Sequence, residues 1–124
     1  MKRTALIALS LALLAPSAAH AAQDLPTLYQ AYEEAGYSTL SMEQLNQTVT
    51  FTAVALGVSS NLQGEPLIEA GDDQGQVLAR LTSSDDQQGA KLSALEEGAS
   101  FTASCTLQFS SGSDYLSFGD CALQ

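Results

Sequence analysis

Apolar residues recur every three or four positions between residues 25 and 36, which predicts an amphipathic helix. Asp24 stands before this helix as an N-cap, and Gly36 follows it as a stop. A short polar turn is expected over residues 41–46, where Ser41 begins the spacing of a capping box. The chain therefore places a helix and a turn ahead of its first strand.

Residues 48–58 carry no charge and are rich in β-branched side chains, which predicts a strand. Val49 and Phe51 share one face of this strand. The apolar residues that follow share the opposite face, and they are Val54, Leu56 and Val58. A bulge or strong bend over residues 52–54 would bring both sets onto one core, as in the long bent first strand of a small barrel.

The rest of the chain alternates between short strands, polar turns and one more helix. Two strands, a helix and two closing strands are expected at residues 67–70, 76–82, 85–98, 99–109 and 115–123. Five strands with a helix ahead of the first and another between the third and fourth match the oligonucleotide/oligosaccharide-binding barrel, or OB-fold. An α+β sandwich with the same strand count is the competing architecture. We therefore predict a mainly β, five-stranded OB-fold barrel.

Residues 1–21 have the three-part pattern of a cleavable signal peptide. Lys2 and Arg3 precede an apolar run over 5–15, and small residues lead to Ala21. The run is too short for a bilayer, which needs about 20 apolar residues. We expect cleavage after Ala21, a single domain over 22–124, a periplasmic or secreted location, and no stable membrane insertion.

Loss of the signal peptide would make an acidic chain more acidic. Lys2 and Arg3 would leave, so that Arg80 and Lys91 would face 14 acidic residues, for a formal charge of −12. Such a field repels phosphate backbones, and two basic residues neutralise few phosphates. This balance predicts that nucleic acid is not a partner. Whether the acidic pairs serve solubility alone or meet a cation or a basic partner stays open.

Cys105 and Cys121 are the only cysteines, and they mirror each other about the turn over residues 110–114. Opposed cross-strand positions in an oxidising compartment predict a disulfide between them. That register puts Leu116 and Phe118 on the face opposite Cys105, Leu107 and Phe109. A bulge at Gly119 would bring the two sets onto the same face.

The expected mature chain has no histidine, because His20 belongs to the signal peptide. A hydrolase would need a nucleophile with a base, and in the absence of histidine only Lys91 could serve as that base. A zinc site would need histidine or free cysteine ligands. A calcium site at residues 72–75 lacks the alternating ligands of an EF-hand. We therefore expect no enzyme, no cofactor and no metal site.

Three segments carry a resemblance to the tRNA_anti-like family of small exported OB-fold proteins. They are LYQAYEE at 28–34, KLSALEEGASFTASC at 91–105 and YLSFGDCAL at 115–123. The chain departs from the family at 53–55, where members usually carry glycine, and at 78–81, where many carry a further cysteine. The resemblance implies the OB-fold, but its motifs are structural and assign no ligand-binding residue.

An OB-fold usually binds its ligand across strands two and three and the loops after strands one and four. Here this predicts a binding face made of Gln63, Glu65, Glu69, Asp72, Asp73, Arg80 and Tyr115. Tyr115 alone cannot make a stacking platform for bases or sugars. The sequence therefore favours a module that recognises a protein or peptide, including a cationic one. The alternatives are an oligosaccharide-binding module and a structural subunit of an envelope assembly.

Overall fold

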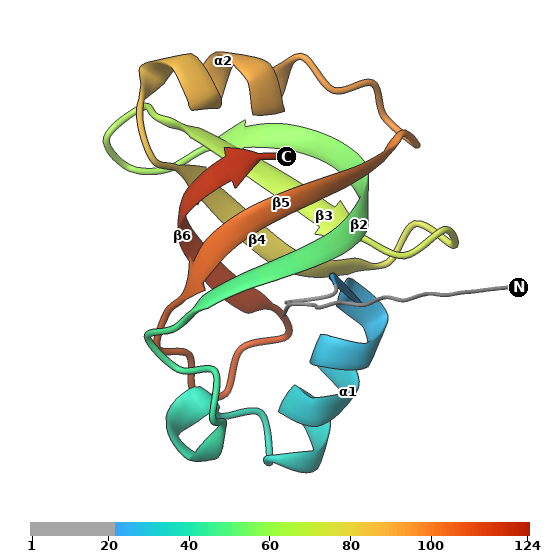
Figure 1. Ribbon diagram of the computed structural model, residues 1–124, viewed down its shortest axis with the longest axis vertical. Helices are drawn as coiled ribbons and strands as arrows, with labels where there is room; N and C mark the ends of the chain where they lie inside the picture. Colours follow the sequence, from blue (N-terminus) through green and yellow to red (C-terminus); the bar gives the residue numbers. More distant parts are fainter. Residues whose placement is uncertain (1–21) are drawn as a thin grey trace, which may run out of the picture.

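The computed structural model describes residues 22–124, so the expected signal peptide lies outside the described residues. The elements appear along the chain in the order shown in Figure 1. They are β1 (Gln23–Asp24), α1 (Leu25–Glu34), the 3-10 helix η1 (Thr39–Ser41), β2 (Thr48–Ser60), β3 (Pro66–Gly71), β4 (Val77–Ser83), α2 (Asp86–Ser93), β5 (Ser100–Leu107) and β6 (Leu116–Leu123).

The five longer strands close into a barrel. The strand order is β1-β2-β3-β4-β6-β5, and an additional pairing of β2 with β5 closes the circle. The pairing of β4 with β6 is parallel, whereas β2–β3, β3–β4, β5–β6 and β2–β5 are antiparallel. In Figure 1 α1 lies at one end of the barrel and α2 at the other. Because α2 falls between the third and fourth barrel strands, the predicted OB-fold is confirmed.

Both helices begin at aspartate caps. Asp24 accepts a hydrogen bond from the Thr27 amide at 3.2 Å, and Asp85 accepts one from the Gln88 amide at 2.8 Å. The second helix ends at Ser93 rather than near Gly98, which corrects the predicted boundary. Gly98 has a φ of +91° and donates its amide to the Ala55 carbonyl at 2.7 Å, so its role is to turn the chain into β5.

The bend of β2 differs from the prediction. The buried residues of its first half alternate regularly, and they are Val49, Phe51, Ala53 and Ala55. Val54 and Leu56 therefore point outward, and the irregularity falls between Ala55 and Gly57 instead of over 52–54. Alanine side chains are small enough to face the interior where the strand bends, which the apolar pattern did not reveal.

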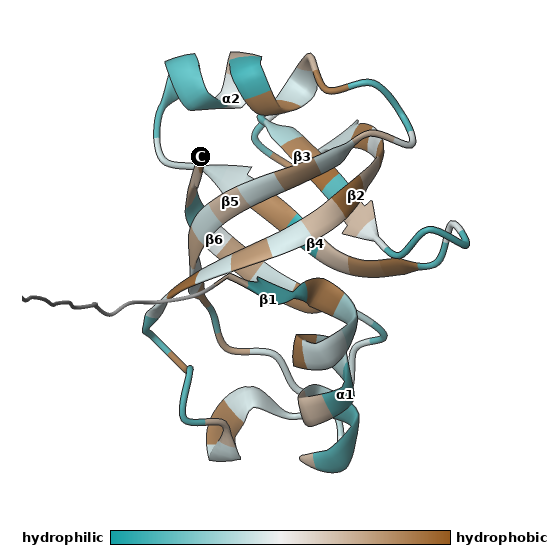
Figure 2. Cartoon of the chain, turned by 45° about the vertical axis from the view of Figure 1, so that its right-hand side comes forward, coloured by the Kyte–Doolittle hydropathy of each residue, from teal (hydrophilic) through white to brown (hydrophobic). Residues whose placement is uncertain are grey.

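Apolar side chains of the strands meet inside the barrel, and Figure 2 shows hydrophobic and polar positions alternating along the strands. The rings of Phe51 and Phe118 lie 4.7 Å apart, centroid to centroid, at its centre. One face of α1 closes the end of the barrel with four buried residues, Leu25, Leu28, Tyr29 and Tyr32. The core is thus continuous from the helix into the barrel.

Tyrosines of α1 hold the connection between β5 and β6. Tyr29 donates its hydroxyl to the Asp114 carbonyl at 2.7 Å, and Tyr32 donates to the Ser113 carbonyl at 2.9 Å. Burial, and then the nearby Tyr37 and acidic groups, raise the pKa of Tyr29 above 10.0, which keeps its hydroxyl a donor. These two hydrogen bonds therefore attach the connection to the helix.

The predicted disulfide joins Cys105 to Cys121, whose Cα atoms lie 4.1 Å apart. The strand register changes next to it, because Ser104 pairs with Ala122 whereas Thr106 pairs with Gly119. Asp120 is the extra residue and has a φ of +52°. The predicted position of the bulge was Gly119, but Gly119 still pairs with Thr106, so the bulge lies one residue later; it returns Leu116 and Phe118 to the core.

Candidate functional site

The structure divides the predicted binding face among three places. Glu69 on β3, Arg80 on β4 and Tyr115 just before β6 lie together on the outside of the barrel. Asp72 and Asp73 line a groove beside β2. The remaining two residues, Gln63 and Glu65, lie in the connection between β2 and β3, and Glu65 lines a cavity beside α2.

Arg80 is the centre of the first group. Its guanidinium carbon lies 4.3 Å from the centre of the Tyr115 ring, a cation–π contact. Its Nη2 atom lies 3.7 Å from Oε2 of Glu69, and both side chains are partly exposed. Within residues 22–124 the buried Nε atom of Arg80 has no hydrogen-bond partner. The group therefore presents the positive charge of Arg80, held in place by Glu69 and Tyr115, and one aromatic ring on an acidic molecule.

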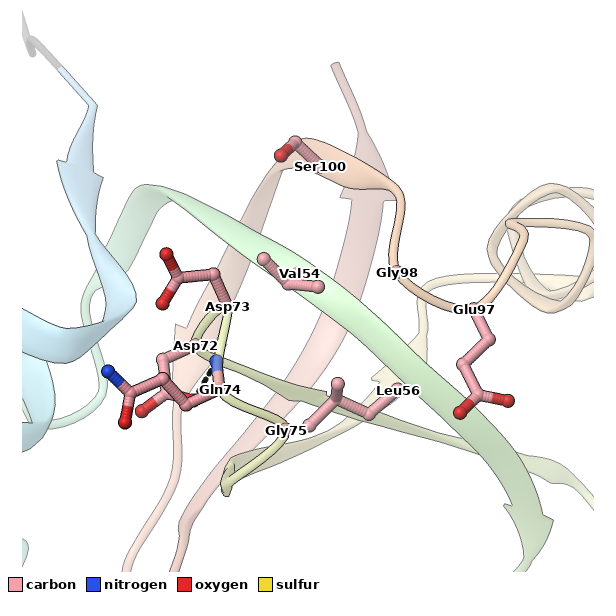
Figure 3. Close-up of a pocket in the computed structure, with 9 residues that line it drawn as sticks. All are labelled: Val54, Leu56, Asp72, Asp73, Gln74, Gly75, Glu97, Gly98 and Ser100. Carbon is pink, nitrogen blue, oxygen red and sulfur yellow. Dashed lines mark hydrogen bonds between the residues drawn. The ribbon is translucent and has the colours of Figure 1, made fainter.

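A larger site lies across the outer face of β2, where the strand bends. We call it the β2 groove; its lining residues, shown in Figure 3, are Val54, Leu56, Asp72, Asp73, Gln74, Gly75, Glu97, Gly98 and Ser100. Its volume is about 660 Å³. A second cavity of about 270 Å³ continues it toward Asp24 and Pro26, sharing Val54, Asp72, Asp73 and Ser100 with it.

The groove combines an apolar floor with acidic sides. Val54 and Leu56 are the outward residues of β2 and are half-buried. Asp72 and Asp73 stand on one side, in the turn between β3 and β4, and Glu97 stands on the other, in the connection from α2 to β5 (Figure 3). None of the residues that line it is basic. The site is therefore suited to a ligand with both apolar and positively charged parts.

The turn that carries two of these acids is rigidly built. One carboxylate oxygen of Asp72 accepts the amides of Gln74 and Gln76, each at 3.0 Å. Gly71 leaves no space for a side chain, because a Cβ there would lie 1.8 Å from the Gln76 carbonyl oxygen. Asp73 is exposed beside this braced turn, so its carboxylate is free to meet a ligand without reordering the backbone.

Sequence reasoning found only part of this groove. It assigned Val54 and Leu56 to the core, and it placed Glu97 in the last turn of a helix that ends earlier. The sequence did contain a signal for this groove, because the apolar residues of β2 switch from one face of the strand to the other. Such a switch can mean a bulge, which was the interpretation chosen, or an outward-facing apolar surface that binds a ligand. Ser100 carried no signal.

Neither a metal centre nor a membrane-spanning helix is found in the described part of the chain. No group of three or more histidine, cysteine, aspartate or glutamate side chains among residues 22–124 is placed to hold a metal ion. No helix within the same residues has the length and apolar character needed to cross a bilayer.

Comparison with known proteins supports the fold. No protein-family model matches the chain, and no curated protein does. The crystal structure of a putative nucleic acid-binding lipoprotein from Klebsiella pneumoniae subsp. pneumoniae MGH 78578 is similar, with a TM-score of 0.62 and 15% sequence identity. The match covers 84% of this chain and 91% of the lipoprotein. At this identity the likeness shows a shared OB-like barrel, and the resemblance to the tRNA_anti-like family stays a prediction.

This comparison contradicts the prediction that nucleic acid is not a partner, because a protein of the same fold is described as a putative nucleic acid-binding lipoprotein. The exclusion was argued from the charge of the whole chain. A ligand instead meets the charges near its own site, since exposed charges farther away than about 10 Å are screened at ordinary salt. The cation–π pair of Arg80 and Tyr115 is such a local exception to the acidic surface.

Proposed function

We propose that the chain is an exported, non-catalytic OB-fold module that binds a positively charged, extended protein segment in the β2 groove. The observation that carries the proposal is the joining of an apolar floor, Val54 and Leu56, to acidic sides without any basic residue. An extended chain alternates its side chains, so it can place apolar residues on such a floor and lysine or arginine beside the carboxylates.

Charge supports this choice of ligand. Each partly exposed ion pair contributes about 0.2–1 kcal/mol, so three carboxylates give a modest but useful attraction. The acidic surface beyond the groove would also speed the approach of a basic partner. The resulting binding would weaken as salt is added.

Export is supported by the signal-peptide pattern of residues 1–21 and by the buried disulfide, which suits an oxidising compartment. A non-catalytic role is supported by the absence of histidine after His20 in the sequence. A periplasmic or secreted location is part of the proposal.

The test is a calorimetric titration of residues 22–124 with a blocked seven-residue peptide of alternating lysine and valine. We expect saturable binding that weakens with added salt. The triple variant Asp72→Asn, Asp73→Asn and Glu97→Gln should bind about tenfold more weakly, since it loses three ion pairs. Asparagine at position 72 keeps an oxygen that can accept the two amides of the turn.

A matched control removes three charges outside the groove, through Glu34→Gln, Glu43→Gln and Asp120→Asn. This control should keep the affinity of the unaltered protein to within about twofold, because exposed charges at a distance are screened. Equal losses in the two triple variants would mean that net charge, and not the groove, attracts the peptide. An absence of binding would contradict the proposed function.

Nucleic acid is a second candidate ligand, favoured by the Arg80–Tyr115 pair and by the similar fold of the putative nucleic acid-binding lipoprotein from Klebsiella pneumoniae. Arginine can pair with phosphate while an aromatic ring stacks on a base. Fluorescence anisotropy with single-stranded DNA and RNA at about 50 mM salt tests it. Binding that Arg80→Gln abolishes and Lys91→Gln leaves intact would support this candidate, and binding insensitive to Arg80 would contradict it.

A further inference from the structure

The second half of β2 has one paired edge and one open edge. Its first half pairs with β5 as far as Val54, where the partner is Ser100. Ala55 still exchanges hydrogen bonds with the turn before β5, at 2.9 Å to the Ala99 carbonyl and at 2.7 Å from the Gly98 amide. Beyond this point β2 continues to Ser60 with β3 on one side only.

The hydrogen-bonding pattern identifies which backbone groups face the open edge. Ser60 lies opposite Pro66, which has no amide hydrogen, so these two residues cannot form a hydrogen-bonded pair. Hydrogen-bonded and non-hydrogen-bonded pairs alternate along an antiparallel ladder. Ser59 therefore bonds to β3, whereas the amides and carbonyls of Val58 and Ser60 point away from it. Among residues 22–124 this half of β2 pairs with β3 alone, and the backbone hydrogen bonds formed outside the helices and strands do not involve Val58 or Ser60.

The open edge is accessible and continues the β2 groove. Val58 is 49% exposed, and Ser60 is exposed as well. The neighbouring helix α2 packs mainly against β3, β4 and β6. Leu56 and Glu97 line the end of the groove from which β2 runs on toward its open half (Figure 3).

We propose that the positively charged segment docks by β-strand addition, pairing its backbone with Val58 and Ser60 in line with β5. This inference rests on the proposed function and adds the mode of binding. The occupant follows from charge: a basic strand at this edge continues the groove on the side of Glu97, whereas a second copy of this acidic chain would be repelled. Backbone pairing then gives affinity that does not depend on the sequence of the segment.

The direct test is residue-resolved amide hydrogen exchange by NMR, with and without the alternating lysine–valine peptide. In the free protein the amides of Val58 and Ser60 should exchange rapidly, while the amide of Ser59 is protected by β3. The peptide should slow exchange at Val58 and Ser60 by at least about tenfold and leave Ser59 unchanged. Ser59 is thus an internal control within the same strand.

A second peptide of the same sequence, with its four central amide nitrogens methylated, keeps every charge but cannot pair along either edge. We expect it to bind at least about tenfold more weakly, as for the loss of two ordinary hydrogen bonds.

Equal affinity of both peptides, without new protection at Val58 and Ser60, would overturn strand addition and leave the groove proposal standing. Failure of both peptides to bind would overturn both proposals. Protection that appears with protein concentration alone would identify a second copy as the occupant and overturn this inference.

Discussion

Two glycines illustrate how a single hydrogen in place of a methyl group sets the shape of the barrel. A Cβ at Gly71 would lie 1.8 Å from the backbone oxygen of Gln76. A Cβ at Gly119 would lie 2.1 Å from Nε2 of Gln108, the end of a flexible and exposed side chain. Similar distances therefore carry different consequences, because a side chain can rotate away and a paired backbone cannot.

We expect Gly71→Ala to lower the free energy of unfolding by about 1–3 kcal/mol, the usual cost of overpacking. Gly119→Ala should lower it by less than about 1 kcal/mol, because Gln108 can move. Urea denaturation of both variants beside the unaltered protein measures the difference. If the two substitutions cost the same, the close approach of Gly71 to the acidic turn is not what shapes that turn.

Among the elements, the last hairpin is the one that a covalent bond holds in place. Cys105 and Cys121 are 16 residues apart in sequence, and both are fully buried between β5 and β6. The bond also lies beside β4, since Ser83 pairs with Cys121. One disulfide therefore fixes the register of a hairpin that contains a bulge.

Replacing both cysteines, Cys105→Ala with Cys121→Ala, should lower the free energy of unfolding by about 3 kcal/mol, from the closure of a loop of this length. The double variant avoids a free thiol, and the single variant Thr106→Ser serves as a control for small changes on β5. Thermal and urea denaturation measure the loss. A double variant as stable as the unaltered protein would show that bulge and core fix the register without the bond.

The sequence predicted most elements because their signals are local. Aspartate caps, β-branched runs and glycine turns act within a few residues, and the cysteine spacing about one turn indicated the register of the last hairpin. The bend of β2 was predicted at the wrong residues. The inward-facing Ala53 and Ala55 are small, and the apolar pattern was read from the larger side chains around them. The groove was missed for a related reason: Val54 and Leu56 are apolar without being core, and only the three-dimensional path of the 97–100 connection shows what they face.

At the scale of the whole molecule, charge is the dominant imbalance. Residues 22–124 contain 14 acidic residues against Arg80 and Lys91. In these residues one ion pair is formed, between Arg80 and Glu69. The folded barrel therefore holds many like charges together without compensation, and self-repulsion lowers its stability at low salt.

Adding sodium chloride from about 10 to about 500 mM should raise the Tm of residues 22–124 by about 5 °C, because screening weakens this repulsion. The variant lacking the charges of Glu34, Glu43 and Asp120 should have a higher Tm at low salt and a smaller rise. Differential scanning calorimetry measures both. A Tm that stays level or falls with salt would mean that the acids are spread too widely to repel one another.

The division of β2 between two partners also bears on how the chain folds. Pairing with β3 is local, whereas pairing of Thr48 with Thr106 joins residues 58 positions apart. Distant pairings form slowly, because the intervening loop must first be ordered. Barrel closure is thus expected late in folding. Until closure, the uncharged first half of β2 leaves an open strand edge that can pair with other chains. Closure is therefore the folding step that competes with aggregation.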